Sequence, residues 1–138
     1  MRKTLYGVAL GIGLTCAVSP IQAHHAFSAE FDGKRPVELD GTITKMEWVN
    51  PHSWITIDVK TPDGKMESWK IEAGSPNVML RRGFNKAMLV AGTQVHVKGF
   101  QAKDGTKKAN GGQMTLPDGQ TLLLTSPGTG APDDDEKK

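Results

Sequence analysis

Apolar and polar residues alternate along much of the chain between residues 24 and 125, a pattern typical of β-strands with one buried face. The clearest example lies at residues 54–60, where Ile55 and Ile57 share one side of the strand. The Thr-Pro-Asp-Gly-Lys segment that follows predicts a turn, because proline fixes φ and glycine accepts a positive φ. We therefore expect a hairpin whose second strand directs Trp69 and Ile71 into the core.

A long first strand is predicted for residues 37–49. Leu39 and Ile43 occupy one face in its first part, whereas Trp48 lies on the opposite parity near its end. Such a change of parity within one strand indicates a bulge or a sharp bend, which we place near residues 44–45.

A short helix is predicted near residues 75–82. Ser75 is a suitable N-cap, Pro76 fits the first helical turn, and Gly83 can end the helix. A fourth strand follows at residues 92–100, and then the many Gly and Lys residues of segment 104–112 predict a loop. A second Pro-Asp-Gly turn near the C-terminal end of the domain predicts a second hairpin.

This order of elements predicts an all-β domain over residues 24–125, with one short helix and the form of a small, OB-like antiparallel barrel. Closure of the sheet would remove exposed strand edges, so we expect a monomer. An open antiparallel sheet or a small sandwich is the main alternative. The residues expected in the core are Ile43, Ile55, Ile57, Val59, Ile71, Val95 and Val97.

Residues 1–23 have the features of a secretory signal peptide: a basic start, an apolar stretch and a small residue at the end. Cleavage after Ala23 fits this pattern better than cleavage after Ser19 or Ala26, which would place a proline or a histidine unfavourably. The apolar stretch is too short for a permanent membrane span, which needs about 20 apolar residues. We therefore expect a periplasmic or secreted mature protein.

Removal of the signal changes the composition of the chain. The single cysteine, Cys16, would be lost, which excludes disulfides, thiolate catalysis and zinc–thiolate or blue-copper sites. Of the 17 basic residues, Arg2 and Lys3 would also be lost, leaving 15 against 15 acidic residues, so the charge does not indicate nucleic-acid binding. Residues 126–138 are rich in Gly, Pro and acidic side chains and predict a disordered acidic tail.

Several segments resemble a known family, and they are residues 24–32, 41–44, 47–54, 74–77 and 80–83. The most specific of them is the Trp-Val-Asn-Pro-His sequence at residues 48–52. In these segments the chain resembles a family of small exported proteobacterial proteins that is classed as a domain of unknown function. The resemblance implies a secreted, β-rich domain whose mature form begins with His-His, and it implies no activity.

The expected cleavage site makes the first residues of the mature chain a candidate metal site. His24 would carry the free amine, and His25 would follow it, so that one amine and two imidazoles lie within two residues. Copper(II) stands high in the divalent affinity order and favours nitrogen donors. An N-terminal histidine can chelate copper through its amine and its ring, and a further imidazole, from His25 or His52, would complete a histidine brace.

His52 lies in the segment between the first two strands, where the preceding proline stiffens the turn and can hold the imidazole outward. A second ring nitrogen of a metal-binding histidine is usually fixed by a neighbouring polar group. The residues considered for this role, or for the rim of the site, are Asn50, Ser53, Trp48 and Trp54.

Each histidine also has a simpler interpretation. His24 and His25 could form a disordered terminal pair without a ligand, and His52 could merely cap its turn. His96 shares the polar parity of its strand, which predicts a surface residue and no metal ligand.

The function that these residues favour first is an exported, periplasmic metal-binding module, with copper as the favoured metal. An OB-type module that binds an oligosaccharide or a peptide through Trp48 and Trp54 is the alternative, although few aromatic residues are present to stack on sugars. A copper-dependent redox enzyme ranks third, because the domain is small and no catalytic residues can be named. The expected partner is a metal ion or an unknown periplasmic protein.

Overall fold

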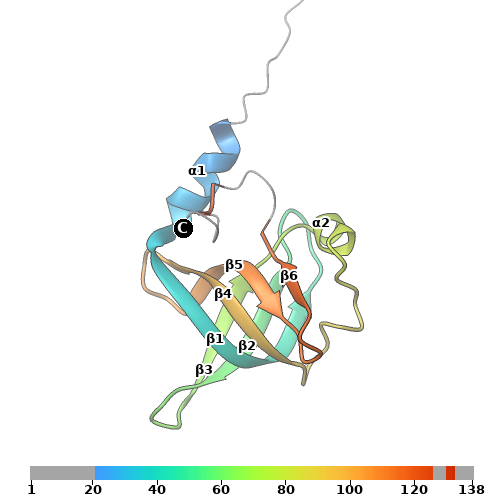
Figure 1. The fold of residues 1–138 in the computed structure, drawn as a ribbon. Helices are drawn as coiled ribbons and strands as arrows, with labels where there is room; N and C mark the ends of the chain where they lie inside the picture. The colour runs from blue at the N-terminus through green and yellow to red at the C-terminus, as the bar shows by residue number, and fades with distance from the viewer. Residues whose placement is uncertain (1–20, 126–129, 133–138) are drawn as a thin grey trace, which may run out of the picture.

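The computed structural model describes residues 21–125 and 130–132, with side chains described from residue 26 onward. These residues form one six-stranded sheet and two short helices (Figure 1). The elements in chain order are α1 (Ile21–Glu30), β1 (Phe31–Glu47), β2 (Trp54–Lys60), β3 (Met66–Glu72), α2 (Pro76–Arg81), β4 (Gln94–Ala102), β5 (Lys108–Thr115) and β6 (Thr121–Leu123). The expectation of a β-rich domain with antiparallel strands is confirmed.

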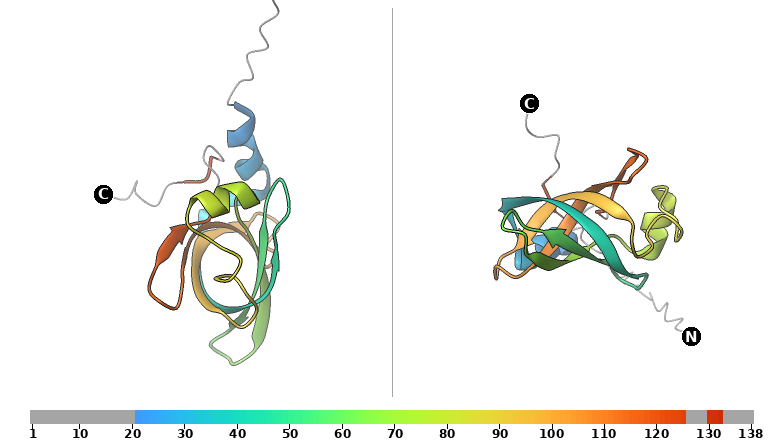
Figure 2. Two further views of the ribbon diagram at one scale, coloured as in Figure 1. Left: turned by 90° about the vertical axis from the view of Figure 1, so that its right-hand side faces the viewer. Right: turned by 90° about the horizontal axis from the view of Figure 1, so that it is seen from below.

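The strands pair in the order β3-β2-β1-β4-β5-β6, and neighbours in this order are antiparallel. A further pairing joins β3 to β5 in parallel, with Lys70 opposite Lys108 and Glu72 opposite Asn110. The two views in Figure 2 show that the sheet is strongly curved. Strands from both halves of the chain are thereby brought side by side.

The first three strands follow the predicted hairpin pattern. Ile55 and Ile57 of β2 are buried, as are Trp69 and Ile71 of β3. The register of β1 against β2 shifts between Ile43 and Lys45, so the predicted bulge is confirmed at its expected place. The strand itself begins earlier than predicted, at Phe31, because its first residues pair with the end of β4.

Helix α2 begins and ends as its sequence predicts. The Ser75 side chain accepts a hydrogen bond from the Val78 amide at 3.4 Å, and Pro76 occupies the first helical turn. Gly83 has a φ of 99°, a conformation that glycine adopts without the strain caused by a Cβ atom.

The predicted loop over residues 104–112 is wrong from Lys108 onward, where β5 begins. The glycines of this segment permit close strand packing instead of making a turn. A Cβ atom at Gly111 would lie 2.6 Å from Leu124 Cδ1, and one at Gly99 would lie 2.2 Å from the Asn110 carbonyl oxygen. Small residues are therefore required where β5 crosses its neighbours.

Two apolar clusters stabilise the described part of the chain. The main core lies between the strands and includes all seven residues expected there, although Val59 is only partly buried. The second cluster consists of Phe27, Phe31 and Ala102, with Phe100 and Ala131 packed against them. Ala131 belongs to the segment expected to be a solvated tail, so this part of the tail contacts the domain.

Helix α1 was not predicted, and it stands at one end of the sheet above the start of β1 (Figure 1). It includes Ala23, the residue after which cleavage is expected. Most of the expected signal peptide, residues 1–20, lies outside the described residues, as do residues 126–129 and 133–138 of the expected tail. No helix in the described ranges is long and apolar enough to cross a membrane.

Candidate functional site

His52 is held at the end of the loop that connects β1 to β2. The next residue, Ser53, extends the pairing of β2 with β3, since its amide donates to the Gly74 carbonyl at 3.0 Å and its carbonyl accepts from the Ala73 amide at 2.9 Å. These bonds fix the backbone directly beside His52. The imidazole is 37 % exposed, so it remains accessible from solvent.

A buried carboxylate orients the His52 ring. His52 Nδ1 contacts Glu72 Oε1, and Asn110 Nδ2 donates to Glu72 Oε2 at 3.2 Å. The Glu72 side chain is only 9 % exposed, and Asn110 is also buried. His52, Glu72 and Asn110 therefore form a polar cluster where the β1–β2 loop, the end of β3 and the beginning of β5 meet.

This arrangement determines which nitrogen of His52 is available. A carboxylate that accepts a hydrogen bond from Nδ1–H favours the tautomer in which Nε2 carries a free lone pair. Within the described residues, no partner contacts the Nε2 atom of His52. A carboxylate that fixes one ring nitrogen while the other remains open is the usual environment of a metal-binding histidine.

The polar cluster continues across the outer surface of the sheet toward α1. Strand register places Trp54 opposite Glu72, Glu72 opposite Asn110, and Asn110 opposite Phe100. Residues directly opposite each other in paired strands project from the same face. We call the face that carries Glu72, Asn110 and Phe100 the covered face, because Phe27 of α1 packs on Phe100 with ring centroids 5.7 Å apart.

His24 and His25 belong to helix α1. His24 precedes Phe27 by three residues, and His25 precedes it by two. Their side chains are outside the described part of the structure, so their contact with His52 stays a prediction. Where side chains are described, no three His, Cys, Asp or Glu residues are grouped to hold a metal ion. The covered face nevertheless brings the segment that follows these histidines onto the same surface as the Glu72–Asn110 pair.

The structure also gives the surroundings of the residues that were considered as neighbours of His52. Ser53 is fully buried and Asn50 is exposed, and neither side chain forms a hydrogen bond with the imidazole among the described residues. Trp48 packs against the main core, and the Lys70 Nζ atom lies 4.7 Å from the centroid of the Trp54 ring. The two tryptophans therefore do not form an open pair of stacking rings.

Glu72 and Asn110 were not predicted to take part in the site. For Glu72 a signal was present, because the register set by the turn at residues 61–65 places it opposite Trp54, two residues from His52. For Asn110 no such signal existed, since its segment reads as a loop and its partner strand lies 38 residues away.

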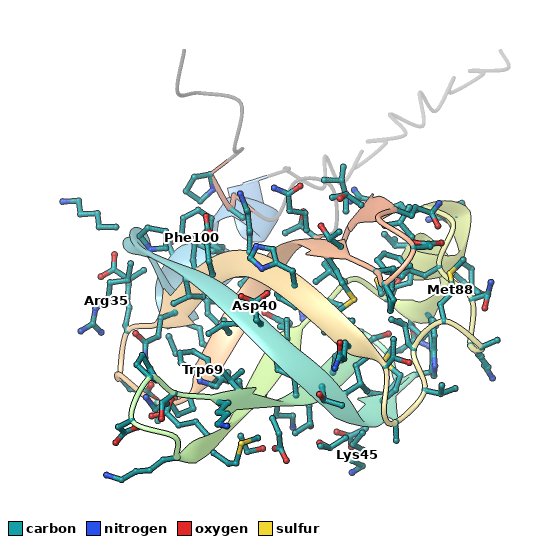
Figure 3. All side chains as sticks on the ribbon, turned by 60° about the horizontal axis from the view of Figure 1, so that its bottom comes forward. Arg35, Asp40, Lys45, Trp69, Met88 and Phe100 are labelled. Atoms are coloured by element: carbon teal, nitrogen blue, oxygen red, sulfur yellow. The ribbon has the colours of Figure 1, made fainter. Side chains whose placement is uncertain are left out.

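His96 lies on another part of the same outer side of the sheet, over β2, β1 and β4, which we call the open face. Its Nδ1 atom lies 2.8 Å from Asp40 Oδ1, and its Nε2 atom lies 3.9 Å from Glu38 Oε2. Figure 3 shows Asp40 on the outer side of β1 and Phe100 beside α1. His96 is thus a surface residue that pairs with carboxylates, consistent with its predicted position.

A groove of about 560 Å³ lies on the open face. Just over half of the residues that line it are polar, and none is Phe, Trp or Tyr. The polar side chains that line it include Asp40, Asp58, Lys60, Gln94, His96 and Thr115.

Comparison with known proteins identifies a family without identifying an activity. The model of a family of unknown function, DUF6152, matches residues 12–112. This match confirms the resemblance to a domain of unknown function. No curated protein and no solved structure matches the chain.

Proposed function

Because the chain belongs to the DUF6152 family, to which no function is assigned, we propose its function from the site itself. We propose that it is an exported module that binds copper(II) through the N-terminus of its mature form and His52. The mature N-terminus would arise by cleavage after Ala23, which leaves His24 with a free amine.

The observation that carries this proposal is the contact between His52 and the buried carboxylate of Glu72. A carboxylate that fixes one ring nitrogen is the usual support of a metal-binding histidine, and a buried carboxylate is costly unless it is paired. Here Glu72 is stabilised by Asn110 and by the imidazole together. The cluster holds Nε2 in one orientation, which lowers the entropy lost when a metal binds.

The available donor set suits copper better than other metals. An amine and imidazoles are nitrogen donors, which copper(II) prefers, and the expected mature chain contains no thiolate. His24 would supply the amine and a ring nitrogen, and His52 Nε2 would supply the third donor, with His25 as the alternative. Copper bound there would act as a Lewis-acidic, redox-active centre.

We propose further that the scaffold is an OB-type barrel. The pairings run from β1 through β2, β3, β5 and β4 and return to β1. The parallel pairing of β3 with β5 completes this ring of five strands, and β6 pairs with β5 outside it. Helix α2 lies between β3 and β4 in the chain. OB-folds commonly bind ligands through the loop between their first two strands, and His52 occupies that loop.

Copper(II) titration of the mature protein tests the proposed function. We expect that adding one glycine before His24, or replacing His52 with alanine, weakens binding at least tenfold, because each change removes a nitrogen donor. His96→Ala is the matched control and should change the affinity less than twofold. Nitrogen hyperfine coupling in the electron paramagnetic resonance spectrum should decrease in the first two variants only.

The proposed site would be wrong if the glycine-extended protein bound copper as tightly as the native one. Terminal sequencing of the exported protein tests the cleavage separately. Any mature start other than His24 would remove the amine ligand and contradict the brace.

The second candidate is a module that binds an oligosaccharide or a peptide, and the observation that favours it is the groove on the open face. Asp58, Lys60 and Gln94 line this groove and make no side-chain hydrogen bond or ion pair within the described residues. Titration with oligosaccharides and with unstructured peptides, followed by the amide shifts of Thr42 and Gln94, tests this candidate. An absence of shifts at millimolar ligand would eliminate it.

A further inference from the structure

A small apolar cluster lies where α1 joins β1, separate from the main core. Phe27 and Phe31 are buried in it, with ring centroids 5.8 Å apart, and Phe100 meets Phe27 edge-on. We call this cluster the aromatic seat. We propose that the aromatic seat positions the mature N-terminus for metal binding, and that Phe27 is a positioning residue. This inference rests on the proposed function.

Polar contacts from β4 and β5 accompany the ring contacts in the same segment. The Lys103 amide donates to the Glu30 carbonyl at 2.9 Å, and Lys103 Nζ donates to the Ser28 carbonyl. Lys108 Nζ pairs with the Glu30 carboxylate, and this hydrogen bond raises the pKa of the lysine above its ordinary value. Cations at the C-terminal end of a helix also interact favourably with its dipole.

The aromatic seat lies beside the polar cluster that orients His52. Phe100, on which Phe27 packs, is directly opposite Asn110, and Asn110 donates to Glu72. His24 precedes Phe27 by three residues, a span of at most about 10 Å when fully extended. The proposed amine ligand is therefore tethered within a short distance of an anchor on the covered face.

Loss of the seat would lengthen this tether. After Phe31, the next residue of β1 that pairs with β4 is Pro36, which lies twelve residues after His24. Effective concentration falls roughly as the −3/2 power of the length of a flexible tether. A change from three to twelve residues thus predicts a decrease of about eightfold in the effective concentration of the amine.

Hydrogen exchange and copper titration of the mature protein test the seat together. The variants are Phe27→Ala, which removes the ring on α1, and Phe100→Ala, which leaves the N-terminal segment unchanged. Val90→Ala, which truncates an exposed apolar side chain outside the seat, is the control. In metal-free native protein we expect amide protection over residues 28–31, and we expect both seat variants to lose it.

Both seat variants should bind copper(II) about fivefold to tenfold more weakly, with the same nitrogen hyperfine pattern at saturation, because the donors are unchanged. Val90→Ala and Phe27→Leu, which keeps most of the apolar contact, should stay within twofold of the native affinity. Protection of the β4 amides of Val95 and Val97 monitors the main core.

Three results would overturn the inference. The first is loss of protection at residues 28–31 with unchanged affinity, which would leave the copper site itself intact. The second is loss of β4 protection in Phe27→Ala, which would make the cluster part of the main core. The third is an unprotected segment in the native metal-free protein. If instead native protein bound no copper, the proposed function would fail, and the seat would lose its proposed role with it.

Discussion

Two histidines of this chain each contact a carboxylate, and their surroundings differ. On the covered face, His52 contacts Glu72, whose side chain is 9 % exposed and also accepts a hydrogen bond from Asn110. On the open face, His96 contacts Asp40, whose side chain is 89 % exposed. The same pair of functional groups is thus built once into a buried network and once onto a solvated surface.

The comparison indicates that burial of the carboxylate, and a second hydrogen bond to it, decide how firmly a histidine–carboxylate pair is held. An exposed pair is screened by water and contributes at most about 1 kcal/mol to stability. A buried carboxylate lacks that screening, so its partners fix both its position and that of the imidazole. We therefore expect the covered face to respond strongly to substitutions that the open face tolerates.

The largest expected effect concerns copper affinity. Glu72→Gln removes the charge that fixes the Nδ1 proton of His52, and loss of such a supporting group usually weakens metal binding about 10- to 100-fold. Asp40→Asn is the matched change at the exposed pair and should alter the affinity less than twofold. Copper(II) competition titrations of both variants measure the difference, and equal effects would remove the distinction between the two faces.

The next effect concerns stability without metal. Glu72→Ala leaves the buried Asn110 amide without its acceptor, which should lower the free energy of unfolding by about 1–3 kcal/mol. Asp40→Ala should change it by no more than about 0.5 kcal/mol, because both partners can bond to water. Urea unfolding of the metal-free proteins checks both values. A decrease of equal size in the two variants would contradict the buried network.

The smallest effect concerns an exposed carboxylate. A hydrogen bond from Lys107 lowers the pKa of Glu67 below its ordinary value, and Trp69 also donates to this carboxylate. Lys107→Ala should therefore raise the pKa of Glu67, as measured by NMR titration. Because a lowered pKa stabilises the fold above the unfolded-state pKa, this contribution is lost as the pH falls through the folded-state pKa. An unchanged pKa in the variant would show that Lys107 is not the cause.

Local features of the fold could be predicted because their signals lie within a few residues. The hairpin between β2 and β3 follows from alternation and turn chemistry, and α2 follows from Ser75, Pro76 and Gly83. The prediction failed for the first part of β5, residues 108–112, where glycines resemble a turn in the sequence but serve close packing in the structure. It also missed α1, whose described anchors are the aromatic seat and the contacts with Lys103 and Lys108, all formed with residues more than 70 positions later.

The β-rich character of the domain, the bulge in β1, the cap of α2 and most of the core follow from the sequence alone, because dihedral preferences and side-chain periodicity act locally. The sequence also singled out His52 as a histidine in a stiff turn. Three contacts became evident only in the folded chain: Glu72 with His52, Asn110 with Glu72, and Phe100 with Phe27. Of these contacts, the one between Asn110 and Glu72 depends on the parallel β3–β5 register, which joins residues 38 positions apart and leaves no periodic signal in the chain.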